Sequence, residues 1–259
     1  MTLLATPVGN TFSHISYLLF CPDTGEAAAI DPFDIDLTLE TARSHRLRIT
    51  RIVNTHEHWD HAGRNDQLRA ATGAKVLAAK AAAGVIEHID ETLRDGDRID
   101  VGTSQTLEVM ETPGHTMTHI SLLGEEAGAP YLLCGDTLFG AGVGNCGFGG
   151  HAPTLFQTIG KLRSRLSPDT RLYPGHDYLA RNLEFTLHHE PSNQAAQTMV
   201  EPARKQVLFT TIGEELEINL FLRLDSEEML DSLVAQGYIP PEANGESVFL
   251  ALRRLRDSW

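Results

Sequence analysis

Short apolar runs alternate with helix-like stretches along the first two thirds of the chain. Ser16–Phe20 and Ala27–Ile30 are separated by the turn-forming segment Cys21–Gly25, which predicts two strands of a hairpin. Other apolar runs predict strands at 51–53, 75–78, 106–110, 120–123, 131–134 and 171–173. Helical spacing predicts helices at 37–45, 65–71 and 154–166. This alternation is typical of an α/β layered domain, and we expect a core of two packed sheets.

Near residue 177 the pattern changes. Leucines recur at helical spacing and strand-like alternation becomes scarce. Asp225 and Glu228 have the spacing of a capping box, which predicts a helix that ends at Gly237. We therefore expect two domains, a larger α/β domain over 1–176 and a smaller helical domain over 177–259.

Composition narrows the possible partners and metal ligands. The 259 residues carry 21 Lys and Arg against 35 Asp and Glu, and a net charge of −14 disfavours nucleic-acid binding. The chain has no signal-peptide pattern and no apolar run near the ~20 residues that span a bilayer, so we expect a cytoplasmic protein without membrane contact. Because the three cysteines form no CxxC pair, imidazole and carboxylate groups would have to hold any metal.

Three histidines and one aspartate lie within six residues, directly after the predicted strand at 51–53: His56, His58, Asp60 and His61. In an extended segment, alternate side chains such as His56 and His58 project the same way and can hold one ion. A tighter turn through Asp60 and His61 can direct that pair at a neighbouring ion. Because imidazole is the commonest metal ligand in proteins, the cluster predicts a metal site, and its spacing favours two metals over one.

Three further candidate ligands each follow an apolar strand: His115, Asp136 and His176. Loops at strand ends are where a layered sheet usually builds its site. Taken singly, each residue has an ordinary structural interpretation. Together with the first cluster they form a set suited to two metals.

In their order along the chain, these motifs resemble those of the metallo-β-lactamase superfamily, which implies an αββα sandwich. Gly135–Phe139, Tyr173–Tyr178 and the arginines near the end of the chain are similar to glyoxalase II, the hydroxyacylglutathione hydrolase family. For the first metal the resemblance implies the ligands His56, His58 and His115. For the second it implies Asp60, His61 and His176, with Asp136 bridging both. Zinc is the expected metal, and iron or manganese accepts the same ligands.

The resemblance also implies a reaction. S-D-lactoylglutathione, a glutathione thioester formed in methylglyoxal detoxification, would be hydrolysed to D-lactate and glutathione. A hydroxide between the two metals, oriented by Asp60, would attack the thioester carbonyl. Because thiols have a pKa near ~8.5, the thiolate leaves with little help from a general acid. We expect a monomer that acts on this small molecule.

Five residues are expected to contact the substrate: Asn145, Phe148, Tyr178, Arg253 and Arg256. For the two arginines, a solvated helix face is the alternative interpretation. The loop Gly140–Gly150 departs from the family pattern, because it contains neither the cation nor the tyrosine found there. Losing one charged contact would weaken binding by about 1.5–3 kcal/mol, which predicts reduced glutathione affinity or another thiol carrier.

Two other functions share these motifs. One is that of a glutathione persulfide dioxygenase with a single iron, and the other is that of a lactonase or another thioesterase of the same fold. The helical extension and the arginines near the chain end favour the hydrolase over both.

Neighbouring polar residues receive other interpretations. His119 is interpreted as a structural histidine, since the ligand set is already full. Asp31 has two interpretations, support of a ligand imidazole or a turn before Pro32. His14 is interpreted as a packing or surface residue.

Overall fold

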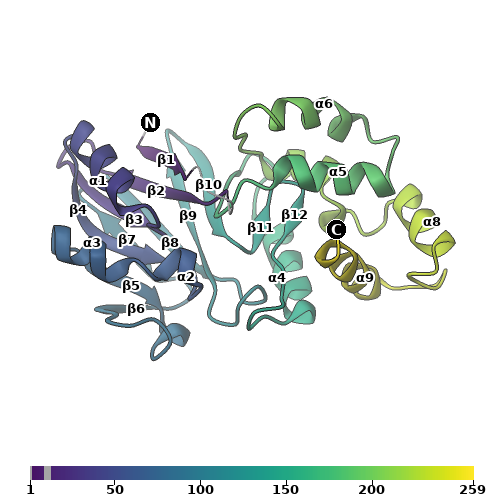
Figure 1. Ribbon diagram of the computed structural model, residues 1–259, viewed down its shortest axis with the longest axis horizontal. Helices are drawn as coiled ribbons and strands as arrows, with labels where there is room; N and C mark the ends of the chain where they lie inside the picture. The colour runs from purple at the N-terminus through teal and green to yellow at the C-terminus, as the bar shows by residue number, and fades with distance from the viewer. Residues whose placement is uncertain (1, 9–12) are drawn as a thin grey trace.

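In the computed structural model, which describes residues 2–8 and 13–259, two β-sheets pack face to face and helices cover their outer faces. Figure 1 shows α1 (Ile35–Ser44) and α3 (Asn65–Thr72) beside the first sheet and the later helices gathered at the opposite end of the molecule. This arrangement confirms the predicted α/β class and αββα sandwich. Within the described residues, no helix combines the length and apolar character needed to cross a membrane.

The first sheet is mixed. In spatial order its strands are β1 (Leu3–Pro7), β2 (Ile15–Phe20), β3 (Glu26–Ile30), β4 (Arg48–Asn54), β5 (Lys75–Ala79) and β6 (Glu91–Leu93). The strands β2 and β3 pair antiparallel, which confirms the predicted hairpin, and β3 through β6 pair in parallel. Because β4 lies between β3 and β5, the loop after β4 starts near the middle of the row of strand ends.

The second sheet carries the other loops of interest. In spatial order its strands are β13 (Arg171–Pro174), β10 (Ala129–Gly135), β9 (Ile120–Glu126), β8 (Gln105–Glu111) and β7 (Arg98–Val101). A two-stranded hairpin of β11 (Leu138–Phe139) and β12 (Gly142–Val143) follows β10 directly. Since β10 and β13 run in parallel, their carboxyl ends deliver the next residues to the same edge.

Side-chain alternation on the strands explains the layers. Tyr17 and Leu19 of β2 point into the core between the sheets, where they join Val109 and Leu122 of the second sheet. Leu18 lies on the opposite face and packs under the outer helices. One strand therefore serves both the inner core and the helix layer.

Two of the longer helices, α1 and α3, pack on the first sheet, and a group that begins with α4 lies next to the second sheet and beyond it. In chain order, the helices of the described residues are α1 (Ile35–Ser44), α2 (Trp59–Ala62), α3 (Asn65–Thr72), α4 (Ala152–Arg165), α5 (Leu179–His189), α6 (Gln194–Ala203), α7 (Ile212–Ile218), α8 (Glu227–Ala235) and α9 (Gly245–Asp257), with 3₁₀ turns η1 (Lys80–Ala82) and η2 (Leu220–Leu222). The apolar stripe of α4 is buried with Phe221 and Phe249 of the later helices in one core cluster. The helical region is thus anchored on the outer face of the second sheet.

One predicted helix start is wrong. The helix α8 begins at Glu227, and its cap Ser226 makes no side-chain capping bond. The carboxylate of Glu228 instead accepts hydrogen bonds from the amide and hydroxyl of Ser192. A capping box does exist at Thr211 and Glu214, where it starts α7. Tertiary contact therefore outweighs the local spacing at Glu228, while Gly237 does end its helix region in the left-handed conformation.

A buried carboxylate fastens the helical region to the β11–β12 hairpin. Glu215 of α7 is fully buried and accepts a hydrogen bond from the Ala141 amide at 2.9 Å. The Thr210 hydroxyl and the Asn219 amide group also donate to it, each at 2.7 Å. Ala141 has a positive φ of 55°, which is uncommon for alanine, so these contacts hold a strained turn in place.

Replacing this carboxylate will destabilise the protein. Glu215→Ala leaves three donors, on Ala141, Thr210 and Asn219, without their acceptor, and we expect a loss of at least about 2 kcal/mol in unfolding free energy. Urea unfolding followed by circular dichroism measures it. The exposed Glu217 supplies the control, because Glu217→Ala should stay within about 0.5 kcal/mol of wild type. An equal effect of both substitutions would contradict this assignment.

The raised pKa of Glu215 predicts that the stability of the protein depends on pH. Burial raises the pKa of the Glu215 carboxyl to about 7, although its donors oppose that shift. An unfolded glutamate titrates near ~4.3, so between these values the folded state keeps a proton that the unfolded chain has released. The stability that Glu215 adds is therefore greatest below about pH 4.5 and declines as the pH rises through 7. The difference in unfolding free energy between wild type and Glu215→Ala should be larger at pH 5 than at pH 8; a constant difference would contradict the raised pKa.

Candidate metal centre

The fold brings all seven predicted ligands to one edge of the sandwich. His56 and His58 lie on the loop after β4, and Asp60 and His61 lie on the short helix α2 that follows. The remaining ligands come from the second sheet: His115 after β8, Asp136 after β10 and His176 after β13. Residues 120 positions apart in sequence thus meet because their strands end at the same edge.

Three imidazoles form the first group. The Nε2 atoms of His56 and His115 each lie 3.0 Å from Nδ1 of His58. Nitrogens that surround one tetrahedral ion at ~2.0–2.1 Å stand about 3.3 Å apart, which is close to these separations. The three nitrogens therefore fit a single divalent cation.

The second group combines two imidazoles and a carboxylate. His61 Nε2 lies 3.3 Å from His176 Nε2, and Asp60 Oδ2 lies 3.3 Å from the same His176 atom. The distance from Asp60 Oδ2 to His61 Nε2 is 3.8 Å. These atoms fit a second cation beside the first.

Asp136 lies between the two groups. Its Oδ2 is 3.4 Å from Nε2 of both His115 and His176, and its Oδ1 is 3.4 Å from His61 Nε2. Within the described part of the chain, the buried Oδ1 has no hydrogen-bond partner. A buried carboxylate oxygen without a donor is costly, and a bound cation removes that cost.

Protein acceptors outside the centre fix two of the rings. His61 Nδ1 donates to Asp31 Oδ2 at 2.9 Å, which leaves its Nε2 unprotonated toward the centre. His56 Nδ1 lies 3.0 Å from the Thr55 hydroxyl oxygen, whose own proton goes to Asp31. Of the two interpretations of Asp31, the structure therefore supports the hydrogen bond to a ligand imidazole.

Backbone carbonyls of the loop 140–150 fix two others. His115 Nδ1 donates to the Asn145 carbonyl at 2.7 Å, and His58 Nε2 donates to the Phe148 carbonyl at 3.0 Å. Each bond places the proton on the outer nitrogen and leaves the inner one free to bind a cation. The glycine-rich loop is thus part of the metal centre through its main chain.

His119 supports the centre from behind. Its Nε2 accepts the Asp136 backbone amide at 3.0 Å, and its Nδ1 lies within 3.0 Å of the hydroxyls of Thr112 and Thr137. Both ring nitrogens are therefore engaged, in agreement with the structural interpretation of this histidine.

The ionisation states of Asp136 and His56 suit metal binding. Burial would raise the pKa of Asp136, but the adjacent His176 and His61 hold it well below its usual value. Burial lowers the pKa of His56 well below the usual histidine value. An ionised carboxylate and a neutral imidazole are the forms that coordinate cations.

His14 was not predicted at this site. It is fully buried, forms a bridge with His176 across the sheet edge, and offers a ring nitrogen to the group of Asp60, His61 and His176. Its Nε2 lies 3.0 Å from the Asp31 carbonyl, and its Nδ1 has no partner in the described part of the chain. The chain spacing gave no signal for it, because only the pairing of distant segments places it there.

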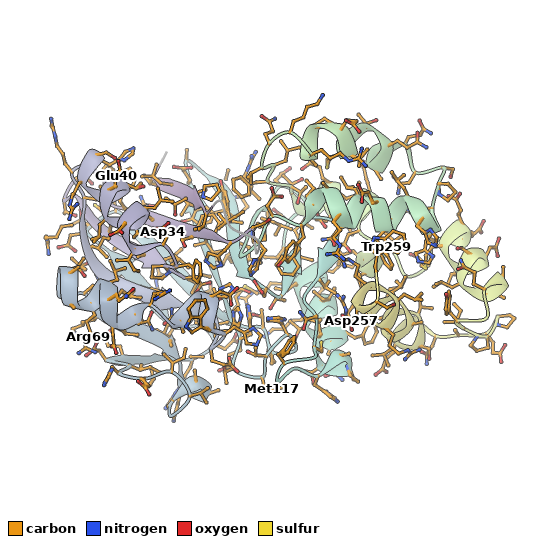
Figure 2. The ribbon with its side chains drawn as sticks, viewed as in Figure 1. Asp34, Glu40, Arg69, Met117, Asp257 and Trp259 are labelled. Atoms are coloured by element: carbon orange, nitrogen blue, oxygen red, sulfur yellow. The ribbon has the colours of Figure 1, made fainter. Side chains whose placement is uncertain are left out.

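A pocket of about 510 Å³ opens next to the centre. All five predicted substrate residues line it: Asn145, Phe148, Tyr178, Arg253 and Arg256. The ring of Tyr178 stacks on His176, with centroids 5.0 Å apart and planes 3° from parallel. Figure 2 labels Asp257, the last residue of α9, and Trp259, whose ring lies against Phe185 and His188 of α5. The pocket is therefore lined by residues from both parts of the chain and lies beside the candidate metal ligands.

The pocket is positively charged. Arg256 donates from Nε and Nη2 to Asn182 Oδ1, and it forms no ion pair with a carboxylate among the described residues. Burial, together with the nearby Arg181 and Arg253, lowers the pKa of Arg256 to about 10. Arg181 was not predicted; it lies three residues after Tyr178 on α5, and that helical spacing was the available signal.

Arg253 is differently placed. It is 5% exposed, and its Nη1 donates to the carbonyls of Val143 at 2.6 Å and Gly144 at 3.2 Å. Its Nε and Nη2 donate to Asp257 Oδ1. Most of its guanidinium is thus engaged within the protein.

Comparisons with known proteins found relatives of both parts of the chain. Residues 21–176 match the family model of the metallo-beta-lactamase superfamily, and residues 177–259 match that of the hydroxyacylglutathione hydrolase C-terminus. A hydroxyacylglutathione hydrolase from Polaromonas sp. is 45% identical, with 97% of each chain covered. The cytoplasmic hydroxyacylglutathione hydrolase of Arabidopsis thaliana is 32% identical, with 94% of each chain covered.

Solved structures agree on the fold. The crystal structure of ETHE1 from Myxococcus xanthus is 26% identical, covers 98% of this chain and 99% of its own, and superposes with a TM-score of 0.69. The sequence relatives reach higher identity and match both parts of the chain. On this basis, the chain belongs to the hydroxyacylglutathione hydrolase family within the metallo-β-lactamase superfamily.

Proposed function

We propose that the protein hydrolyses S-D-lactoylglutathione to D-lactate and glutathione. The observation that carries the proposal is a His and Asp cluster suited to two cations, directly beside a pocket with three arginines. A cationic pocket in a protein of net charge −14 selects an anionic ligand such as glutathione. Relatives over nearly the full length are named hydroxyacylglutathione hydrolases.

We propose that the two groups of side chains described above bind two separate metal ions. One divalent ion would be held by His56, His58 and His115. A second would be held by Asp60, His61 and His176, and Asp136 would contact both ions. Divalent ions at these positions would supply Lewis acidity, which lowers the pKa of water and polarises a carbonyl. Zinc is the expected metal, and iron and manganese suit the same ligands.

The chain's own residues position the reactants. Asp60, 23% exposed at its side chain, reaches the edge of the centre and would orient the attacking water. Tyr178 and Arg256 would hold the glutathione portion from the helical side, and Asn145 and Phe148 would contact it from the loop. The thiolate product needs little protonation to leave, since thiols have a pKa near ~8.5.

The two parts of the chain would divide this work. We propose that 1–176 forms the catalytic domain and 177–259 the substrate-binding domain, in a cytoplasmic monomer. The match of 177–259 to the hydrolase C-terminus favours this reaction over a persulfide dioxygenase or a lactonase.

Steady-state hydrolysis of S-D-lactoylglutathione, measured together with metal content per chain, tests the proposed activity. We expect kcat/KM above about 10⁴ M⁻¹s⁻¹ in protein that carries close to two metals. Asp136→Ala should bind less metal and lose more than about 100-fold in activity, because changes outside the ligand shell already cost 10–100-fold. Two bound metals with negligible thioester turnover would reject the substrate, and one iron with oxygen uptake on a persulfide would reject the reaction.

The role of the pocket predicts a change in substrate affinity. Arg256→Met should raise KM for the glutathione thioester by about ten-fold or more, since a hydrogen bond to a charged group contributes about 1.5–3 kcal/mol. The value of kcat should change little, because Arg256 does not contact a proposed metal ligand. Arg254→Met is the matched control, as Arg254 is exposed on the same helix. An unchanged KM in Arg256→Met would place the glutathione elsewhere.

A further inference from the structure

The loop 140–150 connects the last helix to the metal ligands. On one side, its carbonyls at Asn145 and Phe148 accept the ring protons of His115 and His58. On the other side, Arg253 of α9 donates from one guanidinium nitrogen to the carbonyls of Val143 and Gly144. The two sets of contacts are adjacent in sequence, since Gly144 directly precedes Asn145.

The loop also presses closely on His115. A Cβ atom built on Gly144 would lie 2.8 Å from His115 Nδ1 and 2.1 Å from the Asp136 carbonyl oxygen. No side chain fits at Gly144 unless its neighbours move. The backbone of Gly144 therefore lies directly against the ring of His115 and the main chain of Asp136. A shift of the Val143 and Gly144 carbonyls would therefore move the acceptor that orients His115.

Arg253 is itself held rigidly. Asp257 accepts from Nε at 3.1 Å and from Nη2 at 2.9 Å, and the guanidinium lies 5.5 Å from the ring centroid of Phe221. The planar guanidinium can bind a carboxylate on one side and two carbonyls on another, which the single ammonium group of lysine cannot do. Arg256 differs, because among the described residues its guanidinium donates hydrogen bonds only to Asn182, which leaves donors for a ligand.

We propose that Arg253 is a positioning residue for the metal ligand His115, and that it acts through the carbonyls of Val143 and Gly144. This inference rests on the proposed function in so far as the seven-residue cluster binds metal. It gives Arg253 a part distinct from that of Arg256, although both line the same pocket.

Four variants test the proposal. Arg253→Met removes both carbonyl contacts, Arg253→Lys keeps the charge on a single donor nitrogen, and Asp257→Asn weakens only the contact of the carboxylate with the guanidinium. Arg254→Met is the matched control on the exposed side of α9. The readouts are the dissociation constant of zinc, from competition with a chelator, and the visible absorption spectrum of the cobalt(II)-substituted protein, which reports ligand geometry.

The proposal expects weaker metal binding and altered geometry. Arg253→Met should weaken zinc binding by about 10-fold or more and change the cobalt spectrum, as do losses of other groups that orient metal ligands. Arg253→Lys should have an intermediate effect, Asp257→Asn a smaller effect in the same direction, and Arg254→Met none. In thioester hydrolysis, kcat should fall in parallel while KM stays within about two-fold of wild type.

If Arg253 instead binds the substrate directly, its variants change KM and leave metal binding unchanged. An unchanged zinc affinity and cobalt spectrum in the Arg253 variants would overturn the proposal, and a ten-fold higher KM would then make Arg253 a substrate contact. Equal effects in Arg254→Met would also overturn it, since they would be unspecific. If Arg253→Met fails to fold by circular dichroism, Arg253→Lys and Asp257→Asn decide.

The outcome does not depend on the substrate. If wild type binds metal but does not hydrolyse S-D-lactoylglutathione, the proposed function fails while the zinc and cobalt measurements still decide the role of Arg253. If wild type binds no metal, both proposals fail together.

Discussion

The site depends on one constraint: each buried ligand imidazole must keep its inner nitrogen unprotonated. A neutral histidine has a single ring proton, so an acceptor on the outer side determines which nitrogen faces the centre. His61 uses the carboxylate of Asp31, whereas His58 and His115 use main-chain carbonyls. Without these acceptors, the ring nitrogens of neighbouring histidines would donate hydrogen bonds to one another, and the geometry that fits two cations would be lost.

This constraint explains why the helical region and the sandwich are interlocked. The carbonyls that orient His58 and His115 follow the β11–β12 hairpin, and contacts from the helical region restrain this hairpin and the loop after it. Glu215 and Arg253 provide that restraint, one at the Ala141 amide and the other at the Val143 and Gly144 carbonyls. The loop that orients His58 and His115 is thereby in contact with helices α7 and α9.

Sequence reasoning predicted what local spacing and strand ends encode. The alternation of His56 and His58, and the turns before His115 and His176, predicted that these candidate ligands lie at one edge, and the structure brings them together there. It could not distinguish the two interpretations of Asp31, because the answer lies in a contact with His61, 30 positions away. It also missed His14, and it assigned a capping role to Glu228 that a distant serine overrides.

The loop contacts have a consequence for divergence within this family. The loop holds His58 and His115 through main-chain oxygens, which every amino acid supplies. A change of an exposed side chain of this loop, such as Phe148 at 76% exposure, therefore leaves these acceptors in place. The side chains of 140–150 that line the pocket can therefore change while the acceptors of His58 and His115 stay in place.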